Sequence, residues 1–402
     1  MRPRMASVAS KPAAAPKSAS SRSAAGPRLK KPASPPASRS AGSSSHSPTS
    51  GAAPAAGLGG GWSYARAGVD LHAAAFAKER IKAIARRTYT PAVLSELGGF
   101  GGLFRIEEGQ AAAPVLVASA DGVGTKLKLA FLTGRHDSVA CDLVNHCVND
   151  VLTQGAQPLF FLDYISLGKM DPAVVEQLVE GIARGCAENG CALLGGETAE
   201  MPELYAPGEY DLAGFIVGLV DRSRILGGSN CRLGDVLLGL GSDGLHTNGY
   251  SLARKVLLEE AKLKLEQFLP ELDETVGDAL LRPHRSYLRS VRSLLGDPRL
   301  KALAHITGGG IPGNLPRVLP ASLRAGVQVG SWPEPPLFGE LRRRGRISEE
   351  EMRRTFNLGL GMIAVVAAGC EDAVAAELRA RGEQVWTIGE LIAGKPGVDF
   401  WE

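Results

Sequence analysis

Apolar residues along the chain form short continuous runs that alternate with amphipathic segments ending in glycine. The runs of strand length are residues 114–120, 158–168 and 191–197. The segments with helical spacing of apolar positions are residues 136–155 and 171–190. Asp171 stands where a helix begins, and Gly155 and Gly190 stand where helices end. The pattern predicts interleaved strands and helices, in which residues 114–120 form a buried strand.

A similar alternation continues in the C-terminal half of the chain. The predicted strands are residues 236–241 and 360–368, and the predicted helices are residues 249–263, 282–295 and 371–382. Between the halves, residues 221–235 are polar and contain glycines, as a connection between domains does. The fold class predicted is α/β with mixed sheets, in two domains at residues 62–222 and 223–402.

The net charge of +3 is distributed unevenly. Residues 1–61 contain nine Lys or Arg and no Asp or Glu, so the remainder carries 36 basic and 42 acidic side chains. The acidic remainder of the chain lacks the excess of basic residues that is typical of nucleic-acid-binding domains. No apolar run has the roughly 18 residues that span a bilayer. The first 61 residues, rich in Ala, Ser, Pro and Arg, match an organelle transit peptide; a disordered tail without a targeting role is the alternative.

Residues 119–130, SADGVGTKLKLA, form the first candidate for a ligand-binding loop. Asp121 follows an apolar run, so it is expected at the carboxyl end of a strand, where α/β sheets bind ligands. Gly122 and Gly124 let the backbone approach an anion, and Thr125 and Lys126 supply a hydroxyl and a cation for phosphate oxygens. The spacing fits neither a P-loop nor a Rossmann turn. A plain turn with an exposed lysine remains the alternative.

The segment that follows places polar residues on one face of a predicted helix. These residues are Asp142, Asn145, His146, Asn149 and Asp150. Offsets of 0, 3, 4, 7 and 8 put them in one stripe, and asparagine is a poor choice for a merely solvated helix face. We therefore expect the stripe to face a ligand or a metal, with Asp121 and Asp142 as oxygen ligands of Mg²⁺. The alternative is that these acids cap or pair structurally.

Several further loops combine glycines with polar side chains. The candidate positions are Lys82 in a basic helix, the glycines of GGFGGLF (Gly98, Gly99, Gly101 and Gly102), Glu197 and Glu200 after a strand, Asp243, His246 and Asn248 in GSDGLHTNGY, and the glycines of HITGGG, including Gly309 and Gly310. Glycine-rich turns of this kind can hold anions. A lone loop histidine is more often structural than catalytic, but the polar neighbours of His246 favour a role in proton transfer.

In chain order, the informative segments are SYARAGVD, GGFGGLF, ADGVGTKLKLA, DLVNHCVNDVLTQGAQPLFFLDY, GGETAEMP, GSDGLHTNGYSL, HITGGGIPGNLPRVLP and TFNLGLGM. Together they resemble the aminoimidazole ribonucleotide synthetase family, also called phosphoribosylformylglycinamidine cyclo-ligases. The resemblance extends from Ser63 to nearly the C-terminus. It implies the two-domain fold called PurM-like, in which the N-terminal domain contributes strands to a β-barrel across a homodimer.

The resemblance also implies a reaction and its cofactors. Formylglycinamidine ribonucleotide and ATP would give 5-aminoimidazole ribonucleotide, ADP and phosphate, with Mg²⁺ and a monovalent cation such as K⁺ as the ions to consider. The roles implied are catalysis by His246, Asp121 and Lys126; metal binding by Asp121 and Asp142; ATP binding by Lys82, Gly99, Gly101, Gly102, Gly122, Gly124, Thr125, Asn145 and Asn149; and substrate binding by Glu197, Asn248, Gly309 and Gly310.

Other readings of the same motifs remain open. A thiamine-phosphate kinase would transfer phosphate without closing a ring, and a selenophosphate synthetase would need a reactive cysteine that GGFGGLF lacks. A nucleotide-binding regulator that has lost catalysis is the non-enzymatic alternative. The N-terminal extension lies outside the resemblance and suits a plastid enzyme first and a mitochondrial one second. No nucleic-acid or membrane partner is expected.

Overall fold

A computed structural model describes residues 71–97 and 102–402 of the chain. The predicted transit segment and the predicted nucleotide-loop glycines Gly98, Gly99 and Gly101 lie outside these residues. Within the described ranges, no helix combines the length and apolar character needed to cross a bilayer.

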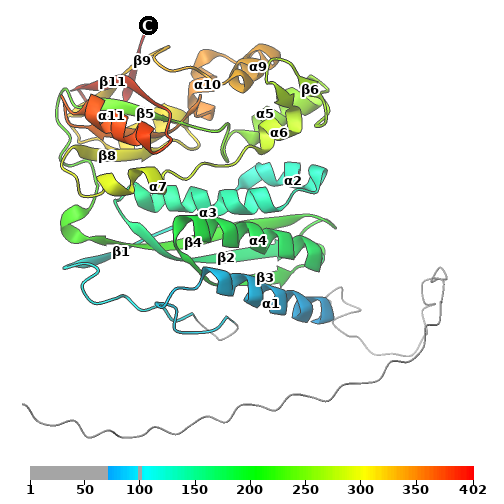
Figure 1. Cartoon of the computed structure of the whole chain (residues 1–402). Coiled ribbons are helices and arrows are strands. Elements are labelled where there is room, and N and C mark those ends of the chain that lie inside the picture. Colours follow the sequence, from blue (N-terminus) through cyan, green and yellow to red (C-terminus); the bar gives the residue numbers. More distant parts are fainter. Residues whose placement is uncertain (1–70, 98–101) are drawn as a thin grey trace, which may run out of the picture. The chain divides into compact units, whose positions relative to one another are not determined.

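The first half of the described chain contains a four-stranded mixed sheet in the order β1-β4-β2-β3. Its strands are β1 (Pro114–Gly122), β2 (Gln157–Leu167), β3 (Ala192–Glu200) and β4 (Tyr210–Asp221). Strand β4 is antiparallel to both β1 and β2, whereas β2 and β3 are parallel. Three helices accompany this sheet (Figure 1): α1 (Leu71–Ala85), α3 (Asp137–Leu152) and α4 (Pro172–Asn189).

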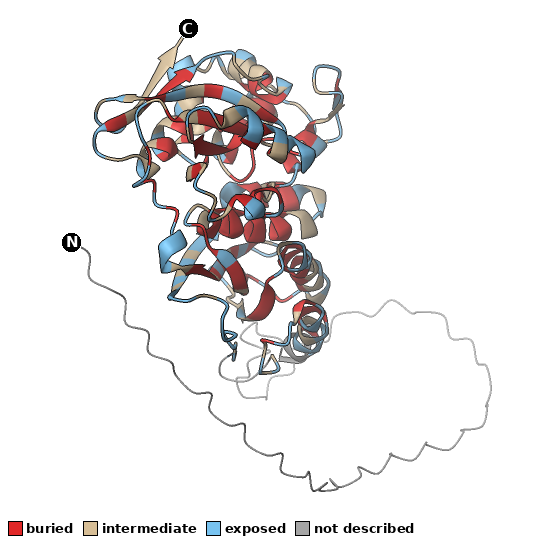
Figure 2. Ribbon diagram, turned by 60° about the vertical axis from the view of Figure 1, so that its left-hand side comes forward, coloured by how far each residue is buried: buried red, intermediate tan, exposed pale blue. Residues whose placement is uncertain are grey.

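The two faces of this sheet differ in burial (Figure 2). Phe161 and Ile165 of β2 are fully buried in the core that includes α3 and α4. By contrast, Leu116 and Phe215 are 59% and 45% exposed. No residue of β1 is buried, so the predicted buried strand at 114–120 is wrong in its burial: β1 is an edge strand, and the sheet is open beside it.

The second half contains a six-stranded mixed sheet in the order β12-β9-β11-β5-β10-β8. Its strands are β5 (Val236–Gly241), β8 (Leu300–His305), β9 (Leu323–Gln328), β10 (Leu360–Val366), β11 (Val385–Ala393) and β12 (Val398–Trp401). Neighbouring strands are antiparallel except for β12 and β9. Every residue of β10 is buried because both faces are covered: Met362 and Val366 share a core with α11, and Ile363 packs with Ile311 and Leu315.

The remaining elements surround this second sheet or join it to the first. They are α2 (Leu127–Thr133), α5 (Tyr250–Arg254), a π-helical turn (Lys255–Glu260), β6 (Phe268–Leu269), β7 (Glu274–Thr275), α6 (Val276–Leu281), α7 (Leu288–Val291), α8 (Gly310–Asn314), α9 (Pro336–Gly345), α10 (Glu349–Thr355) and α11 (Glu371–Ala380). The first sheet ends at Asp221 and the second begins at Val236. The fold is thus a two-domain mixed α/β fold, and the exact domain limits stay a prediction.

Two helix predictions have different outcomes. The helix at 171–190 is confirmed as α4: the Asp171 side chain accepts from the Ala173 N–H, and Gly190 ends the helix with a φ of 68°. The helix at 282–295 is wrong over its first six residues, because α7 begins only at Leu288. Pro283 disfavours a helix through this position, and the backbone after it makes hydrogen bonds to α3 instead.

Candidate active site

Most of the polar stripe on α3 binds backbone groups of a distant, non-helical segment. The His284 N–H donates to Asp142 Oδ1 over 2.6 Å, and Asn145 Nδ2 donates to the His284 carbonyl over 2.8 Å. Asn149 Nδ2 donates to the Arg285 carbonyl over 2.8 Å. These side chains satisfy buried peptide groups that would otherwise be costly to bury. The nucleotide contacts predicted for Asn145 and Asn149 stay predictions, and the structure gives both amides partners within the chain.

Lys126 and Asp142 form an ion pair inside the protein. Lys126 Nζ lies 2.5 Å from Asp142 Oδ2, and both side chains are completely buried. The ammonium group also donates to the carbonyls of Arg282 and His246, over 2.8 and 3.1 Å. Burial raises the pKa of Asp142, although Lys126 opposes this shift. Lys126 is therefore not the exposed lysine of a plain turn, and the pair matches the structural alternative for Asp142; their predicted phosphate and metal roles stay predictions.

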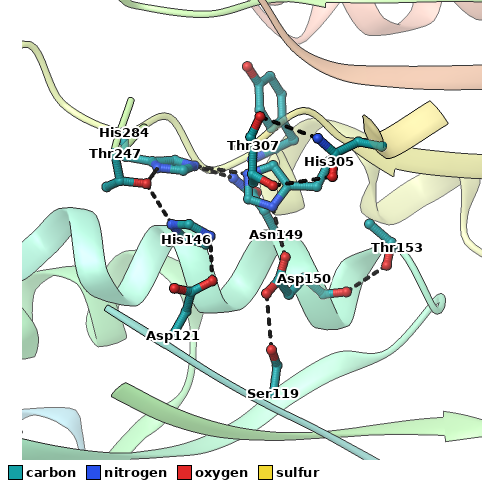
Figure 3. Close-up of polar contacts among 12 residues, drawn as sticks. Ser119, Asp121, His146, Asn149, Asp150, Thr153, Thr247, His284, His305 and Thr307 are labelled. Carbon is teal, nitrogen blue, oxygen red and sulfur yellow. Dashed lines mark hydrogen bonds and ion pairs between the residues drawn. The ribbon is translucent and has the colours of Figure 1, made fainter. Parts of the chain in front are cut away.

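The other two residues of the stripe belong to what we call the imidazole–carboxylate cluster, formed by Asp121, His146, Asp150 and His305 (Figure 3). His146 Nε2 lies 2.8 Å from Asp121 Oδ2, and His305 Nδ1 lies 2.9 Å from Asp150 Oδ1. His146, Asp150 and His305 each offer one ligand atom within 4.8 Å of the others. Among the described residues, this is the group that could hold a metal ion. Sequence reasoning chose Asp121 as a metal ligand, placed His146 and Asp150 in the stripe without assigning either a role, and missed His305.

Opposing effects set the charges of this cluster. Burial raises the pKa of Asp121 and Asp150, but the contacts with His146 and His305, respectively, outweigh burial and leave both pKa values lowered. Burial lowers the pKa of His305, and the contact with Asp150 offsets this only in part. The cluster therefore pairs ionised carboxylates with a neutral His305 at neutral pH.

His246 lies next to this cluster in an unusual environment. Its backbone has a φ of 61°, its side chain is buried, and its ring stacks on that of His284 with 4.2 Å between centroids. Burial holds its pKa well below the ordinary value. Nδ1 has no hydrogen-bond partner among the described residues. A strained backbone and an unpaired buried nitrogen are features of functional positions, so proton transfer by His246 remains a supported prediction.

The two glycine-containing loops of the second half approach one another. A Cβ on Gly308 would lie 3.1 Å from Asn248 Oδ1. Gly309 and Gly310 have φ values of 96° and 59°, and a Cβ on Gly310 would lie 2.0 Å from the Arg353 carbonyl. The structure thus requires glycine at 310 for backbone packing, while substrate contacts by this loop stay a prediction.

A cavity of about 650 Å³ lies between α1 and strands β2 and β3 of the first sheet. It brings together Lys82 and Gly102, predicted for the nucleotide, and Glu197, predicted for the substrate. Asp163 also lines it, and burial raises the pKa of Asp163 to about 7, with Glu197 adding to the shift. The Asp163 carboxyl has no hydrogen-bond partner from another described side chain. A charge inside the apolar run PLFFLDYISL was the sequence signal that could have identified it.

A second cavity, of about 370 Å³, is lined by residues from both halves of the described chain. Thr125 and Asn248, predicted as nucleotide and substrate ligands, both line it, and Thr125 Oγ1 lies 2.9 Å from Ser251 Oγ. Gly122 donates its N–H to Asp121 Oδ1 over 2.7 Å, and Gly124 has a φ of 53° with open space where a Cβ would be. The loop 121–125 therefore lies between the imidazole–carboxylate cluster and this cavity.

Two domain models of one family match the chain. The AIR synthase related protein N-terminal domain matches residues 102–220, and the corresponding C-terminal domain matches residues 232–401. The chain is 54% identical over 333 residues to the phosphoribosylformylglycinamidine cyclo-ligase of Sorangium cellulosum, covering 82% of this chain and 95% of that protein. It is 51% identical over 328 residues to the protein of that name from Trichlorobacter lovleyi, covering 82% and 94%.

Solved structures of more distant proteins share the fold. The thiamine-monophosphate kinase of Stenotrophomonas maltophilia superposes with a TM-score of 0.58 at 21% identity, over 80% of this chain and 94% of that one. The hydrogenase maturation protein HypE in complex with ATP gives 0.57 at 16% identity, over 79% and 88%. The family models cover most of both halves and the curated relatives are more than 50% identical, so the chain belongs to the AIR synthase related family, among the phosphoribosylformylglycinamidine cyclo-ligases.

Proposed function

We propose that this chain closes the imidazole ring of 5-aminoimidazole ribonucleotide, converting formylglycinamidine ribonucleotide and ATP to that product, ADP and phosphate. The observation that carries this assignment is identity above 50% to curated cyclo-ligases over more than four-fifths of the chain. The kinase alternative is not favoured, because the thiamine-monophosphate kinase shares only the fold at 21% identity. Retention of Asp121, Lys126 and His246 in one region argues against a regulator without catalysis.

The reaction needs activation of a poor leaving group followed by ring closure. The γ-phosphoryl group of ATP passes to the formamide oxygen, and the amidine nitrogen of the same molecule attacks the activated carbon. The carbon–oxygen bond then breaks, phosphate leaves, and the nitrogen loses a proton. Because the nucleophile is in the same molecule, effective concentration supplies much of the rate advantage. The protein must position two substrates and neutralise phosphate charge.

ATP fits the cavity beside α1 because Lys82 offers a cation and Gly102 lets the loop approach closely. The ATP complex of the structurally similar HypE supports a nucleotide in this fold. For Mg²⁺, the carboxylates of Asp121 and Asp150 supply the oxygen ligands that this ion prefers, and a bound Mg²⁺ would neutralise phosphate charge. K⁺ stays a candidate cofactor, and we assign none of the described side chains to it. His246, buried and neutral, is suited to accept the proton released on ring closure.

The assembly and location of the enzyme are further parts of the proposal. The uncovered face of the first sheet exposes Leu116 and Phe215, and pairing this face with that of a second copy would bury both. We therefore infer a homodimer with a barrel formed across the interface. The basic, Ser- and Ala-rich segment 1–61 supports import into a plastid, with the mitochondrion as the alternative. Domain limits at 62–222 and 223–402 complete the proposal.

The test is a coupled measurement on the full chain with formylglycinamidine ribonucleotide, ATP and Mg²⁺. Phosphate and the aminoimidazole product should appear in equal amounts. Phosphate release without the imidazole would instead identify a kinase. Asp121→Asn should reduce turnover by orders of magnitude, whereas Asp137→Asn, which changes an exposed ion pair with Arg184, should leave it unchanged.

A further inference from the structure

Asp163 carries a buried carboxyl at the wall of the cavity beside α1. Only 8% of the residue is exposed, and it is one of the residues that line the cavity. Within residues 71–97 and 102–402, no hydrogen bond joins this carboxyl to another side chain. Buried polar side chains normally have such a partner, so an unpartnered carboxyl at a cavity wall points to a ligand.

Glycines on both neighbouring strands decide where this carboxyl lies. Asp163 pairs with Gly214 of β4 and with Gly196 of β3. The space beside Gly214 is filled, because a Cβ there would lie 2.4 Å from Phe161 Cζ and 3.0 Å from Leu143 Cγ. On the other side, a Cβ on Gly196 would lie 2.1 Å from Asp163 Oδ1, so the carboxyl occupies the place of the missing side chain. Gly196 also lines the cavity, and the carboxyl therefore faces into it.

The other cavity residues suit the two ends of a nucleotide. Lys78 and Lys82 are one turn apart on α1, which lies beside β3 (Figure 1), so both can face a phosphate chain. The apolar side chains suit a purine ring; they are Ile81, Leu97, Leu162, Leu194 and Phe215. Because phosphates gain most from the two cations, the Asp163 carboxyl is left to contact the base.

The surroundings of Asp163 favour its neutral form. Burial raises the pKa of its carboxyl to about 7, and the negative charge of Glu197 on β3 adds to the shift. The other ionisable groups around it are Lys78 and Lys82 of α1, Glu96 of the loop that follows α1, and the thiol of Cys186 on α4. The acid therefore keeps its proton up to about neutral pH.

A neutral carboxylic acid complements the Watson–Crick edge of adenine. That edge offers N1 as an acceptor and the 6-amino group as a donor, and the acid supplies one O–H donor and one carbonyl acceptor. An ionised carboxylate has only acceptors. It repels adenine N1 and suits guanine instead, whose N1–H and 2-amino group both donate.

We propose that Asp163, as a neutral acid, binds the Watson–Crick edge of adenine and makes this enzyme select ATP over GTP. The inference deepens the proposed function and rests on its placement of ATP in the cavity beside α1. Binding of adenine then holds the proton on Asp163, so at pH 8 the chain takes up a proton when ATP binds.

The test is nucleotide binding to the full chain, measured by isothermal titration calorimetry with Mg²⁺ and without a second substrate. At pH 8, ATP should bind with uptake of about one proton, read from the dependence of the apparent enthalpy on the buffer. The preference for ATP over GTP should fall about tenfold for each pH unit above 7. GTP carries the same phosphates, so the ratio of the two affinities cancels the titration of the phosphate groups.

Two variants identify the residue responsible. Asp163→Asn should bind ATP at pH 6 as the unaltered chain does, because an amide offers the same donor and acceptor, but it should show no proton uptake and no fall in preference with pH. Asp163→Ala should lower the preference for ATP over GTP at pH 6 at least tenfold. Asp137→Asn, which changes an exposed acid outside the cavity, should behave as the unaltered chain.

The proton measurement on the unaltered chain does not depend on the variants folding. ATP binding without proton uptake at pH 8, or with equal uptake in Asp163→Asn, would overturn the proposal and leave ring closure standing. Absence of ATP binding would overturn the placement of ATP and this inference with it. Proton uptake as expected, without formation of the imidazole in the coupled assay, would overturn the proposed function alone.

Discussion

Replacing Lys126 by methionine separates a structural role for this lysine from a phosphate-binding one. The side chain is completely buried, and its ammonium group contacts Asp142 Oδ2 and the carbonyls of Arg282 and His246. Lys126→Met keeps most of the aliphatic volume but leaves a buried carboxylate without its counter-charge. Removing one member of a buried ion pair costs about 3–5 kcal/mol of unfolding free energy. We expect a loss of this size, measured by urea denaturation followed by circular dichroism.

The loss should also depend on pH. Burial raises the pKa of Asp142 in the folded state, and removing Lys126 raises it further, whereas the unfolded value is about 3.9. Between these two values the folded chain binds more protons than the unfolded one, so stability falls as pH rises. The deficit of Lys126→Met should therefore be smaller near pH 4 than at pH 8, and Lys126→Met with Asp142→Asn should recover part of it.

Lys128→Met is the matched control for this experiment. Lys128 lies two residues away and pairs with Glu209, but both side chains are about two-fifths exposed, so the loss should stay below about 1 kcal/mol. If Lys126→Met lost no more stability than Lys128→Met, the buried pair would not stabilise the fold as reasoned here. A raised KM for ATP with unchanged stability would instead support the phosphate contact predicted from the sequence.

Three further changes test other parts of the structure. Gly361→Ala places a Cβ 2.1 Å from Tyr287 Oη and 2.4 Å from His246 Cε1, so it should cost about 1–3 kcal/mol of unfolding free energy and lower kcat by moving His246. Normal stability and a normal kcat would show that this site has room for a methyl group. Between about pH 4 and 7 the folded Asp163 carboxyl, with its pKa raised to about 7, keeps a proton that the unfolded chain has lost, so the stability of the parent chain falls as pH rises. Asp163→Asn should flatten this dependence; parallel pH profiles of urea stability for variant and parent would refute this. If the open face of the first sheet forms the dimer interface, Phe215→Glu should be monomeric by light scattering. Leu233→Glu, which changes an exposed residue of the other half, should remain dimeric. A dimeric Phe215→Glu variant would place the interface elsewhere.

The sequence was sufficient to predict several of the elements and the polar stripe of α3, because helical periodicity is local, but it did not predict strands β4, β8, β9, β11 and β12. It was not sufficient to predict what the stripe contacts. Asp142, Asn145 and Asn149 bind the backbone at 284–287, more than 130 residues away in the sequence. The spacing of residues within one helix cannot predict which distant segment that helix contacts. The same contacts account for the wrong helix at 282–287, since peptide groups bonded to α3 cannot also bond within a helix.

The candidate site residues likewise fall into those that a local sequence pattern indicates and those whose role depends on contacts between distant segments. The sequence suggested Asp121, Thr125 and Asn248 because each stands at or just after the expected end of a strand, near glycines; their roles stay predictions. His305 has the same signal, since it ends β8 three residues before Gly308, the first glycine of the triplet, yet its role depends on facing Asp150 of α3. The long-range pairing of the two halves decides which polar residues become ligands, and that pairing is not encoded in local pattern.

The polar stripe of α3 makes two sets of contacts, and both sets join the first half of the described chain to the second. One row of the stripe holds the segment 284–287, and the adjacent positions His146 and Asp150 meet His305 of the second sheet. The cluster is therefore complete only when the two halves of the described chain are in contact, and the contact of His305 with Asp150 should stabilise that pairing. His305→Ala should accordingly lower the urea midpoint more than His136→Gln, whose contact with Tyr210 lies within the first half; equal losses would show that the contact of His305 with Asp150 does not stabilise the pairing of the halves.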